Sequence, residues 1–294
     1  MEVTFWGVRG SIPAPGPGTV RYGGNTACVS IRTAAGALLV LDCGTGARNL
    51  GLALLGDDGA AGVGGGFGAG TGEAAILLSH THWDHIQGFP FFGPLYVEGN
   101  RFQIYGPAES SALLEGILEG QMAPQYFPVQ TLKNMGARID IAALSAGTTR
   151  EILGCRVTAA MNPHGRSGAM AFRIEELGGS ERRSVVYASD AGYPPEGPPA
   201  EVLALYAGAD LLIHDSTFTP DDRARYPHRG LASVSEAVQA AVRARAGKLA
   251  LFHYDQDYTD AEVDALVERA RHELARSGAT TELRPAVEGE TISV

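Results

Sequence analysis

The sequence predicts an α/β protein in which two β-sheets pack face to face and helices cover their outer faces. Two observations predict this fold class. Short apolar segments of strand length alternate with helical segments in both halves of the chain, and several strand segments end on histidine or aspartate. The composition does not change between the halves, so we expect one domain over residues 1–294.

The N-terminal third predicts strands joined by tight turns. We expect strands over residues 3–6, 27–33 and 37–42, and a helix over residues 44–55. Residues 56–72 are rich in glycine and alanine and nearly free of large side chains. Such a segment cannot bury enough apolar surface to order itself, so it predicts a flexible surface loop.

The rest of the chain alternates strands and helices around one irregular region. Further strands are expected over residues 74–79, 154–160, 169–174, 184–188, 210–213 and 248–252. Residues 89–129 mix proline, glycine and aromatic residues around a short helix at 110–119, and we expect them to wall a pocket. Capping boxes at Ser233 and Thr259 begin the last two helices, which end near Ala246 and at Gly278.

The charge of the chain limits the classes of partner. The net charge is −10, from 23 basic and 33 acidic residues. A protein that binds long nucleic acid needs many Lys and Arg contacts to phosphates, so this balance argues against such a partner. A small anionic substrate stays possible, because bound metal ions supply local positive charge.

The chain carries no sign of a membrane or of a disulfide framework. No apolar run approaches the roughly 20 residues of a membrane helix. The three cysteines, Cys28, Cys43 and Cys155, are widely spaced and form no Cys-x-x-Cys motif. We expect them to be unpaired and buried, as suits a cytoplasmic protein in a reducing compartment.

A cluster of metal-binding side chains follows the strand at residues 74–79. His80, His82, Asp84 and His85 lie within six residues. Residues two apart in an extended segment point to the same side, so His80 and His82 can reach one ion. Asp84 and His85 can reach a second ion nearby, and imidazole and carboxylate are the ligands that catalytic zinc prefers.

One segment cannot complete two metal sites, so further ligands must come from elsewhere. His164, Asp190 and His253 each follow an apolar strand segment. A single polar residue in such a place is usually a turn former. Three of them are more simply explained by convergence on one edge of the sheets.

These residues resemble the metallo-β-lactamase superfamily, whose motif is His-x-His-x-Asp-His followed by a distant His, Asp and His. The resemblance implies the four-layer αββα metallo-β-lactamase sandwich, with two mixed sheets and helices on the outer faces. It implies two divalent metal ions, with zinc favoured and manganese or iron also suited. The implied ligands are His80, His82 and His164 for one ion, Asp84, His85 and His253 for the other, and Asp190 between them. Asp42, in an Asp-x-Gly turn, is similar to an acceptor that orients a ligand histidine.

Two further stretches are similar to the phosphodiesterase branch of the superfamily. Gly23-Gly-Asn25-Thr-Ala-Cys28 resembles its Gly-Gly-Asn-Thr-x-Cys stretch and implies that Asn25 contacts substrate. His214-Asp215-Ser-Thr217 resembles a segment whose acid pairs with a later histidine to protonate the leaving oxygen, while His214 itself is expected to be structural. That later histidine would fall near Leu231, which departs from the pattern. His228 either replaces it as the partner of Asp215 or is a solvated loop residue, and the sequence leaves both open.

The resemblance implies hydrolysis of a small phosphodiester, favouring a cyclic nucleotide, by a hydroxide that bridges the ions. Asp84 would both bind metal and orient that hydroxide. The alternatives are a tRNA 3′-end processing endonuclease and a lactone, β-lactam or thioester hydrolase. The branch is commonly dimeric, so a homodimer is expected. Trp6, Trp83 and the aromatic residues of 89–92 either stack a base or pack in the core, and core packing is favoured.

Overall fold

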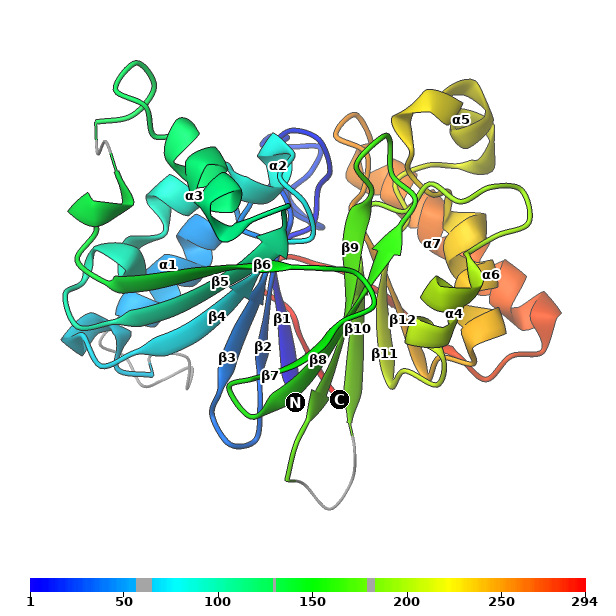
Figure 1. Ribbon diagram of the computed structural model, residues 1–294. Helices are drawn as coiled ribbons and strands as arrows, with labels where there is room; N and C mark the ends of the chain where they lie inside the picture. Colours follow the sequence, from blue (N-terminus) through cyan, green and yellow to red (C-terminus); the bar gives the residue numbers. More distant parts are fainter. Residues whose placement is uncertain (57–64, 129–130, 179–182) are drawn as a thin grey trace.

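The fold is a sandwich of two mixed β-sheets with helices on the outside (Figure 1). The structure is a computed structural model, and it describes residues 1–56, 65–128, 131–178 and 183–294. Within these residues each sheet has seven strands. The αββα fold class predicted from the sequence is confirmed.

The first sheet is built mainly from the first half of the chain. Its strands in spatial order are β14 (Thr291–Ser293), β1 (Glu2–Gly7), β2 (Cys28–Arg32), β3 (Leu38–Leu41), β4 (Glu73–Leu77), β5 (Arg101–Pro107) and β6 (Arg138–Leu144). The pairs from β14 to β3 are antiparallel, and those from β3 to β6 are parallel. The last strand therefore returns from the end of the chain to pair with the first.

The second sheet repeats this pattern with the second half of the chain. Its strands in spatial order are β13 (Glu282–Pro285), β12 (Lys248–Phe252), β11 (Leu211–Asp215), β10 (Ser184–Ala188), β9 (Ala169–Glu176), β8 (Cys155–Asn162) and β7 (Thr149–Ile152). The pairs from β7 to β10 are antiparallel, and those from β10 to β13 are parallel. Every residue of β10 and β11 is buried, as expected for central strands covered on both faces.

The longer helices cover the outer faces of the two sheets, and the two shortest, α2 and α5, lie in the loops beyond the strand ends (Figure 1). They are α1 (Ala47–Leu55), α2 (Trp83–Ile86) and α3 (Ser111–Gly120) in the first half, and α4 (Ala200–Tyr206), α5 (Pro220–Arg225), α6 (Val234–Ala244) and α7 (Asp260–Ser277) in the second. Both predicted capping boxes are present, at Ser233 before α6 and at Thr259 before α7. Gly278 ends α7 with a left-handed backbone, as predicted.

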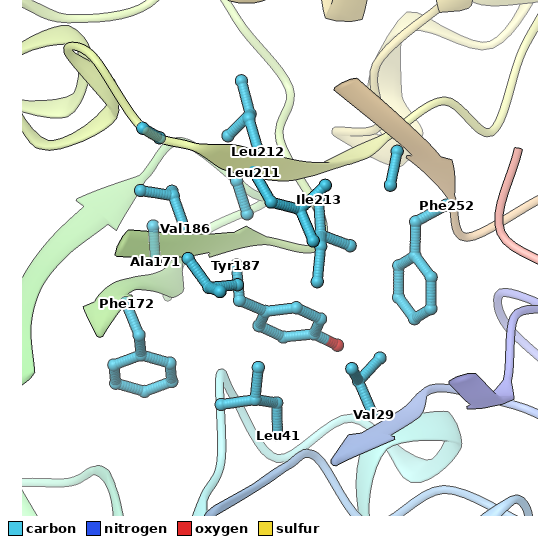
Figure 2. Packing of buried hydrophobic residues seen from close by; sticks show 14 of the residues in the cluster. Val29, Leu41, Ala171, Phe172, Val186, Tyr187, Leu211, Leu212, Ile213 and Phe252 are labelled. Carbon is cyan, nitrogen blue, oxygen red and sulfur yellow. The ribbon is translucent and has the colours of Figure 1, made fainter. Parts of the chain in front are cut away.

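The main core lies between the two sheets. Figure 2 shows Val29 and Leu41 of the first sheet facing Tyr187, Ile213 and Phe252 of the second, all of them fully buried. A second apolar cluster fills the space between the first sheet and its helices α1 and α3. This packing fixes the sheets against each other, and with them the loops that leave their strand ends.

The predicted strands are confirmed to within two residues at each end, but several elements were not predicted. They are the strands β5, β6, β7, β13 and β14 and the helices α2, α4 and α5. Strand β5 falls inside the region that we expected to be irregular. Part of the predicted loop at 56–72, residues 57–64, lies outside the described residues, while Phe67 in its described part is buried in a short 3₁₀ turn.

The cysteine prediction is confirmed, since Cys28, Cys43 and Cys155 are free and buried. Among the helices that the structure describes, none combines the length and the apolar character needed to cross a membrane.

Candidate metal centre

The predicted metal-binding residues come together where strands of both sheets end. His80, His82, Asp84 and His85 follow β4 of the first sheet, and α2 begins inside this loop. The three remaining residues follow strands of the second sheet: His164 after β8, Asp190 after β10 and His253 after β12. The structure gathers these seven side chains into two adjoining groups.

The first group consists of His80, His82, His164 and Asp190, whose ligand atoms all lie within 4.8 Å of one another. His164 Nε2 and His82 Nδ1 are 3.2 Å apart. Two nitrogens bound to a tetrahedral zinc at the usual bond length would be separated by about 3.3 Å. The spacing of the two rings therefore fits a shared cation.

The second group consists of Asp84, His85 and His253, again within 4.8 Å of one another. Asp84 Oδ2 lies 3.2 Å from His85 Nε2 and 3.3 Å from His253 Nε2. His85 and His253 are fully buried, or nearly so, and their rings stack with centroids 5.4 Å apart. This group also presents one carboxylate and two imidazoles to a common point.

Asp190 joins the two groups. Its Oδ1 lies 3.1 Å from His85 Nε2 and 3.2 Å from His253 Nε2. Its Oδ2 lies 3.5 Å from His164 Nε2 and 3.8 Å from His80 Nε2. One oxygen thus faces each group, which is the arrangement that the resemblance implies for a residue between two ions.

The histidines have free nitrogens on the side where cations would bind. His80 Nε2 is buried and has no hydrogen-bond partner, and His85 Nε2 faces only the carboxylates of Asp84 and Asp190. Their Nδ1 atoms lie near Ser79 Oγ, at 3.0 Å, and Asp42 Oδ2, at 2.7 Å. A buried nitrogen without a partner is costly, and a cation would satisfy it. The donor set fits a divalent metal pair, although ligation by these residues stays a prediction.

Asp42 has the role that the resemblance implied. Its carboxylate contacts the Nδ1 of His85 and accepts hydrogen bonds from Ser79 and from the Tyr187 hydroxyl, which donates across 2.7 Å from the second sheet. Asp42 therefore fixes the ring of a predicted ligand from behind.

Burial and neighbouring charges shift the pKa values of the predicted metal ligands. Burial and the neighbouring His85 lower the pKa of His80, which favours the neutral imidazole that metals bind. Burial alone would raise the pKa of Asp84, but His85 and hydrogen bonds from His253 and His85 bring it below its usual value. Burial alone would lower the pKa of His253, but the negative charge of Asp190 outweighs it and raises that pKa to about 9. Binding of a cation to His253 must therefore displace a proton.

The backbone is strained at the ends of the strands that carry the site. Asp42, Asp190 and His253 have φ values of 58°, 50° and 63°, in the left-handed region that non-glycine residues rarely adopt. Such conformations cost of order 1–3 kcal/mol and persist only where surrounding contacts enforce them. Here they turn three polar side chains into the site directly after a buried strand.

Two residues that the sequence did not single out, Gly10 and Ser11, contact the site, and a third, Arg229, reaches it through Ser11. Gly10 packs so closely on His253 that an added Cβ would lie 2.3 Å from the imidazole ring. Ser11 donates its backbone N–H to Asp84 Oδ2 at 2.7 Å. Arg229 donates to Ser11 Oγ at 2.7 Å and to Asp255 Oδ2 at 3.0 Å. The only sequence signal for Arg229 was its place in a basic segment near the expected histidine position.

The structure does not bring Asp215 and His228 into contact, which favours the alternative of a solvated loop histidine, and a catalytic role for either residue stays a prediction. Asp215 is fully buried and accepts hydrogen bonds from the N–H groups of Ala191, Ala232 and Thr217 and from the Thr217 hydroxyl. His228 is exposed, because Pro227 begins a 3₁₀ turn that runs along the surface. Asp215 instead supports the site from behind, since Thr217 Oγ1 lies 3.0 Å from His253 Nδ1.

The structure gives different results for the two other residues discussed with the phosphodiesterase resemblance, Asn25 and His214. Asn25 uses its side chain to donate to Glu288 Oε2 at 2.9 Å, and its carbonyl accepts from the N–H groups of Val8 and Arg9. These contacts anchor the loop before β2 and do not bring Asn25 to the seven-residue cluster. His214 is structural as predicted, fully buried and 2.8 Å from the Tyr193 hydroxyl.

The fold and this cluster define a metal-dependent hydrolase of the αββα type. A family model described as the beta-lactamase superfamily domain matches residues 69–254, which is more than half of the chain. The chain belongs to this family. Its match contains all seven residues of the predicted metal centre.

Individual relatives agree with this family. The chain is similar to a protein named Ribonuclease Z from Natronomonas pharaonis, with 26% identity covering 88% of each chain. Among solved structures it is similar to the metallo-beta-lactamase fold protein YhfI from Bacillus subtilis, with a TM-score of 0.67 and 20% identity, covering 99% of this chain and 98% of the other. It is also similar to the short form of human tRNase Z, with a TM-score of 0.64 and 19% identity, covering 100% and 99%.

Proposed function

We propose that this chain is a dinuclear metal-dependent phosphodiesterase that cleaves RNA, with the 3′ end of a precursor tRNA as its first candidate substrate. The observation that carries the two-metal part is Asp190, whose two oxygens each face one group of histidines. The RNA part is supported by relatives named Ribonuclease Z that align over most of the chain.

The proposal assigns one cation to His80, His82 and His164, and the other to Asp84, His85 and His253, with Asp190 contacting both. Zinc suits these nitrogen and carboxylate donors best, and manganese or iron would also bind. When bound, such a pair lowers the pKa of water and neutralises charge on a phosphate.

The protein groups around the cations would orient the substrate. Asp84 is held by the N–H of Ser11, so its carboxylate is fixed for orienting a water molecule. The Arg229 guanidinium is held by Ser11 and by the nearly buried Asp255. A guanidinium fixed in this way offers a planar fork to phosphate oxygens at the edge of the centre.

Arg229 also bears on the negative net charge, which by itself argues against a long nucleic-acid substrate. Although the chain carries −10 overall, Arg229 adjoins Gly230, whose carbonyl contacts Nδ1 of the predicted ligand His164. Arg166 is exposed two residues beyond that histidine. The cationic side chains near the centre, together with bound metal, give an anionic substrate a local positive field.

A small phosphodiester such as a cyclic nucleotide is the second candidate. The observation that favours it is the acidic net charge, which weakens binding of a long polyanion far from the centre. The precursor tRNA and the small phosphodiester would both be cleaved at the predicted metal centre. They differ in how much of the substrate extends beyond this centre over the protein surface.

Metal content and a substrate panel measured on one preparation test the proposal. The panel contains a precursor tRNA, 2′,3′- and 3′,5′-cyclic nucleotides, bis-p-nitrophenyl phosphate, and a lactone and a β-lactam. We expect close to two ions per chain and cleavage of the precursor near its 3′ end. Turnover of the cyclic nucleotides alone would select the second candidate, and turnover of only the lactone or β-lactam would refute phosphodiester chemistry.

A further inference from the structure

A cavity of about 820 Å³ is lined in part by the loop that carries four of the predicted metal ligands. Thr81 and Trp83, which line it, alternate in sequence with His80, His82 and Asp84. Its other walls come from the segment after α2 and from the segment around the end of α3. The region that the sequence predicted to wall a pocket therefore does so, and the pocket opens beside the metal-binding loop.

The walls of this cavity are aromatic and exposed. Trp83, Phe91 and Tyr126 are 74%, 58% and 77% exposed, whereas Phe89 and Phe92 are fully buried. Phe91 and Phe127 pack edge to face with ring centroids 5.1 Å apart. The aromatic residues near the metal loop thus divide into core residues and an exposed group that lines one cavity, and a contiguous exposed apolar surface of this kind marks binding sites.

Apart from the aromatic residues, the polar side chains of the cavity are three amides and the hydroxyl of Thr81. Gln121 lines the wall, and its Nε2 is covered and has no hydrogen-bond partner, so a small rotation of the amide would be needed to offer this donor to a ligand. Gln87 is held in place by donating from Nε2 to Thr26 Oγ1 at 3.1 Å. Among the described residues that line the cavity, none is charged.

We propose that this cavity binds a nucleobase of the substrate, and this rests on the proposed phosphodiesterase function. A nucleobase is planar and uncharged, so it suits aromatic walls without ion pairs, and its carbonyl or ring-nitrogen acceptors suit the free donor of Gln121. A phosphate does not suit a wall without cations. The base would lie against Trp83 while the attached phosphate lies at the metal centre and Arg229.

Binding of free nucleosides tests the cavity without any catalysis. In a Trp6→Phe background, Trp83 is the only tryptophan of the chain. We expect adenosine and uridine to quench its fluorescence in metal-free protein, and ribose 5-phosphate, which has no base, not to quench it. Phe91→Ala and Tyr126→Ala should each weaken nucleoside binding about tenfold, the usual effect of losing one stacking partner. Leu113→Ala, an exposed apolar residue of α3 outside the cavity, is the matched control.

Kinetics test whether the base in the cavity belongs to the substrate. The two substrates are thymidine 5′-(p-nitrophenyl phosphate) and methyl p-nitrophenyl phosphate, which share a leaving group and differ in the nucleoside. We expect the ratio of their kcat/KM values to fall about tenfold in Phe91→Ala and Tyr126→Ala and to stay unchanged in Leu113→Ala.

The outcomes separate this inference from the proposed function. Phosphodiester cleavage without nucleoside quenching would overturn the cavity proposal alone. Nucleoside binding in a protein that cleaves no phosphodiester would overturn the proposed function and leave a base-binding cavity. If Phe91→Ala and Tyr126→Ala instead turn a dimer into a monomer, as measured by light scattering, the surface binds a second copy of the chain and the inference is wrong.

Discussion

At the scale of single residues, the carboxylate of Asp190 decides whether two cations can share the centre. Asp190→Asn keeps the size of the side chain but removes its charge, so we expect one ion or none per chain in place of two. Loss of a supporting contact to a metal ligand typically costs 10- to 100-fold in affinity or activity, and loss of Asp190 should cost about 100-fold or more. Elemental analysis and turnover measure this.

A matched control for Asp190 is Asp140→Asn, an exposed aspartate of β6 with no place in the centre. It should leave both metal content and turnover at the wild-type level. Two ions per chain in Asp190→Asn would contradict the assignment of this residue.

Arg229 gives a second prediction at the residue scale. If its guanidinium binds the substrate phosphate, Arg229→Ala should lower kcat/KM about 10- to 100-fold, the worth of a charge-assisted hydrogen bond. Arg229→Lys should recover only part of the loss, because lysine lacks the planar fork. Metal content should not change, and Arg225→Ala, an exposed neighbour on α5, should behave as wild type. Full activity in Arg229→Ala would show that phosphate binds elsewhere.

His214 predicts part of the pH dependence of stability. Burial lowers its pKa to about 4, from an ordinary value near 6.5. Between these values the unfolded chain binds more protons than the folded one, so stability decreases as the pH falls from about 6.5 to about 4. The contribution lost is on the order of 3 kcal/mol.

His214→Gln should therefore make the stability curve flatter over that pH window, as measured by urea unfolding at several pH values. His272→Gln, at an exposed position of α7, is the control and should reproduce the wild-type slope. Equal slopes for wild type and His214→Gln would show that other groups cause the acid sensitivity.

At the scale of elements, the start of α6 connects helix capping with the metal centre. Ser233 caps α6, and the N–H of the preceding Ala232 donates to the buried Asp215, which supports His253 through Thr217. Ser233→Ala should cost about 1 kcal/mol of unfolding free energy, and so should Thr259→Ala at the equivalent cap of α7. Only Ser233→Ala should also lower turnover. Equal activity in both variants would show that the cap and the centre are not coupled.

The elements differ in how far the sequence predicted them. Helices α6 and α7 were predicted with their first residues because a capping box is a local signal that involves only four residues. Strand β5 was missed because it lies between segments rich in proline, glycine and aromatic residues, and its pairing with β4 and β6 is not local. Helix α4 was missed because it is short and its N-cap is Pro199, with no side-chain acceptor.

At the scale of the whole molecule, the candidate ligands were predictable, but the residues around them were not. The seven predicted ligands have a distinctive spacing, and each follows a recognisable strand. Gly10 and Ser11 reach the centre because the segment after β1 pairs with Tyr254, next to His253, and Arg229 reaches it because the loop before α6 meets Ser11. The two alternatives for His228 stayed open for the same reason, since the turn at Pro227 sets the direction of this side chain and no local pattern reveals it.

The metal centre also predicts how the whole molecule unfolds. Four of the seven ligands follow a strand of the first sheet and three follow strands of the second, while β14 returns from the C-terminus to the first sheet. Cations bound there would hold the two sheets together, and we propose that the chain unfolds as one domain. Because the unfolded chain lacks the site, metal at about 1,000 times its dissociation constant should stabilise the fold by about 4 kcal/mol, or roughly 10 °C in Tm.

Calorimetry of the metal-free and metal-loaded protein measures this stabilisation. We expect a single transition in both states and an increase of Tm with metal concentration. His80→Ala should lose most of that increase, because the variant lacks a ligand from the first sheet, whereas Asp140→Asn should keep it. Two separate transitions, only one of which moves with metal, would show that the sheets unfold independently and that the centre does not join them.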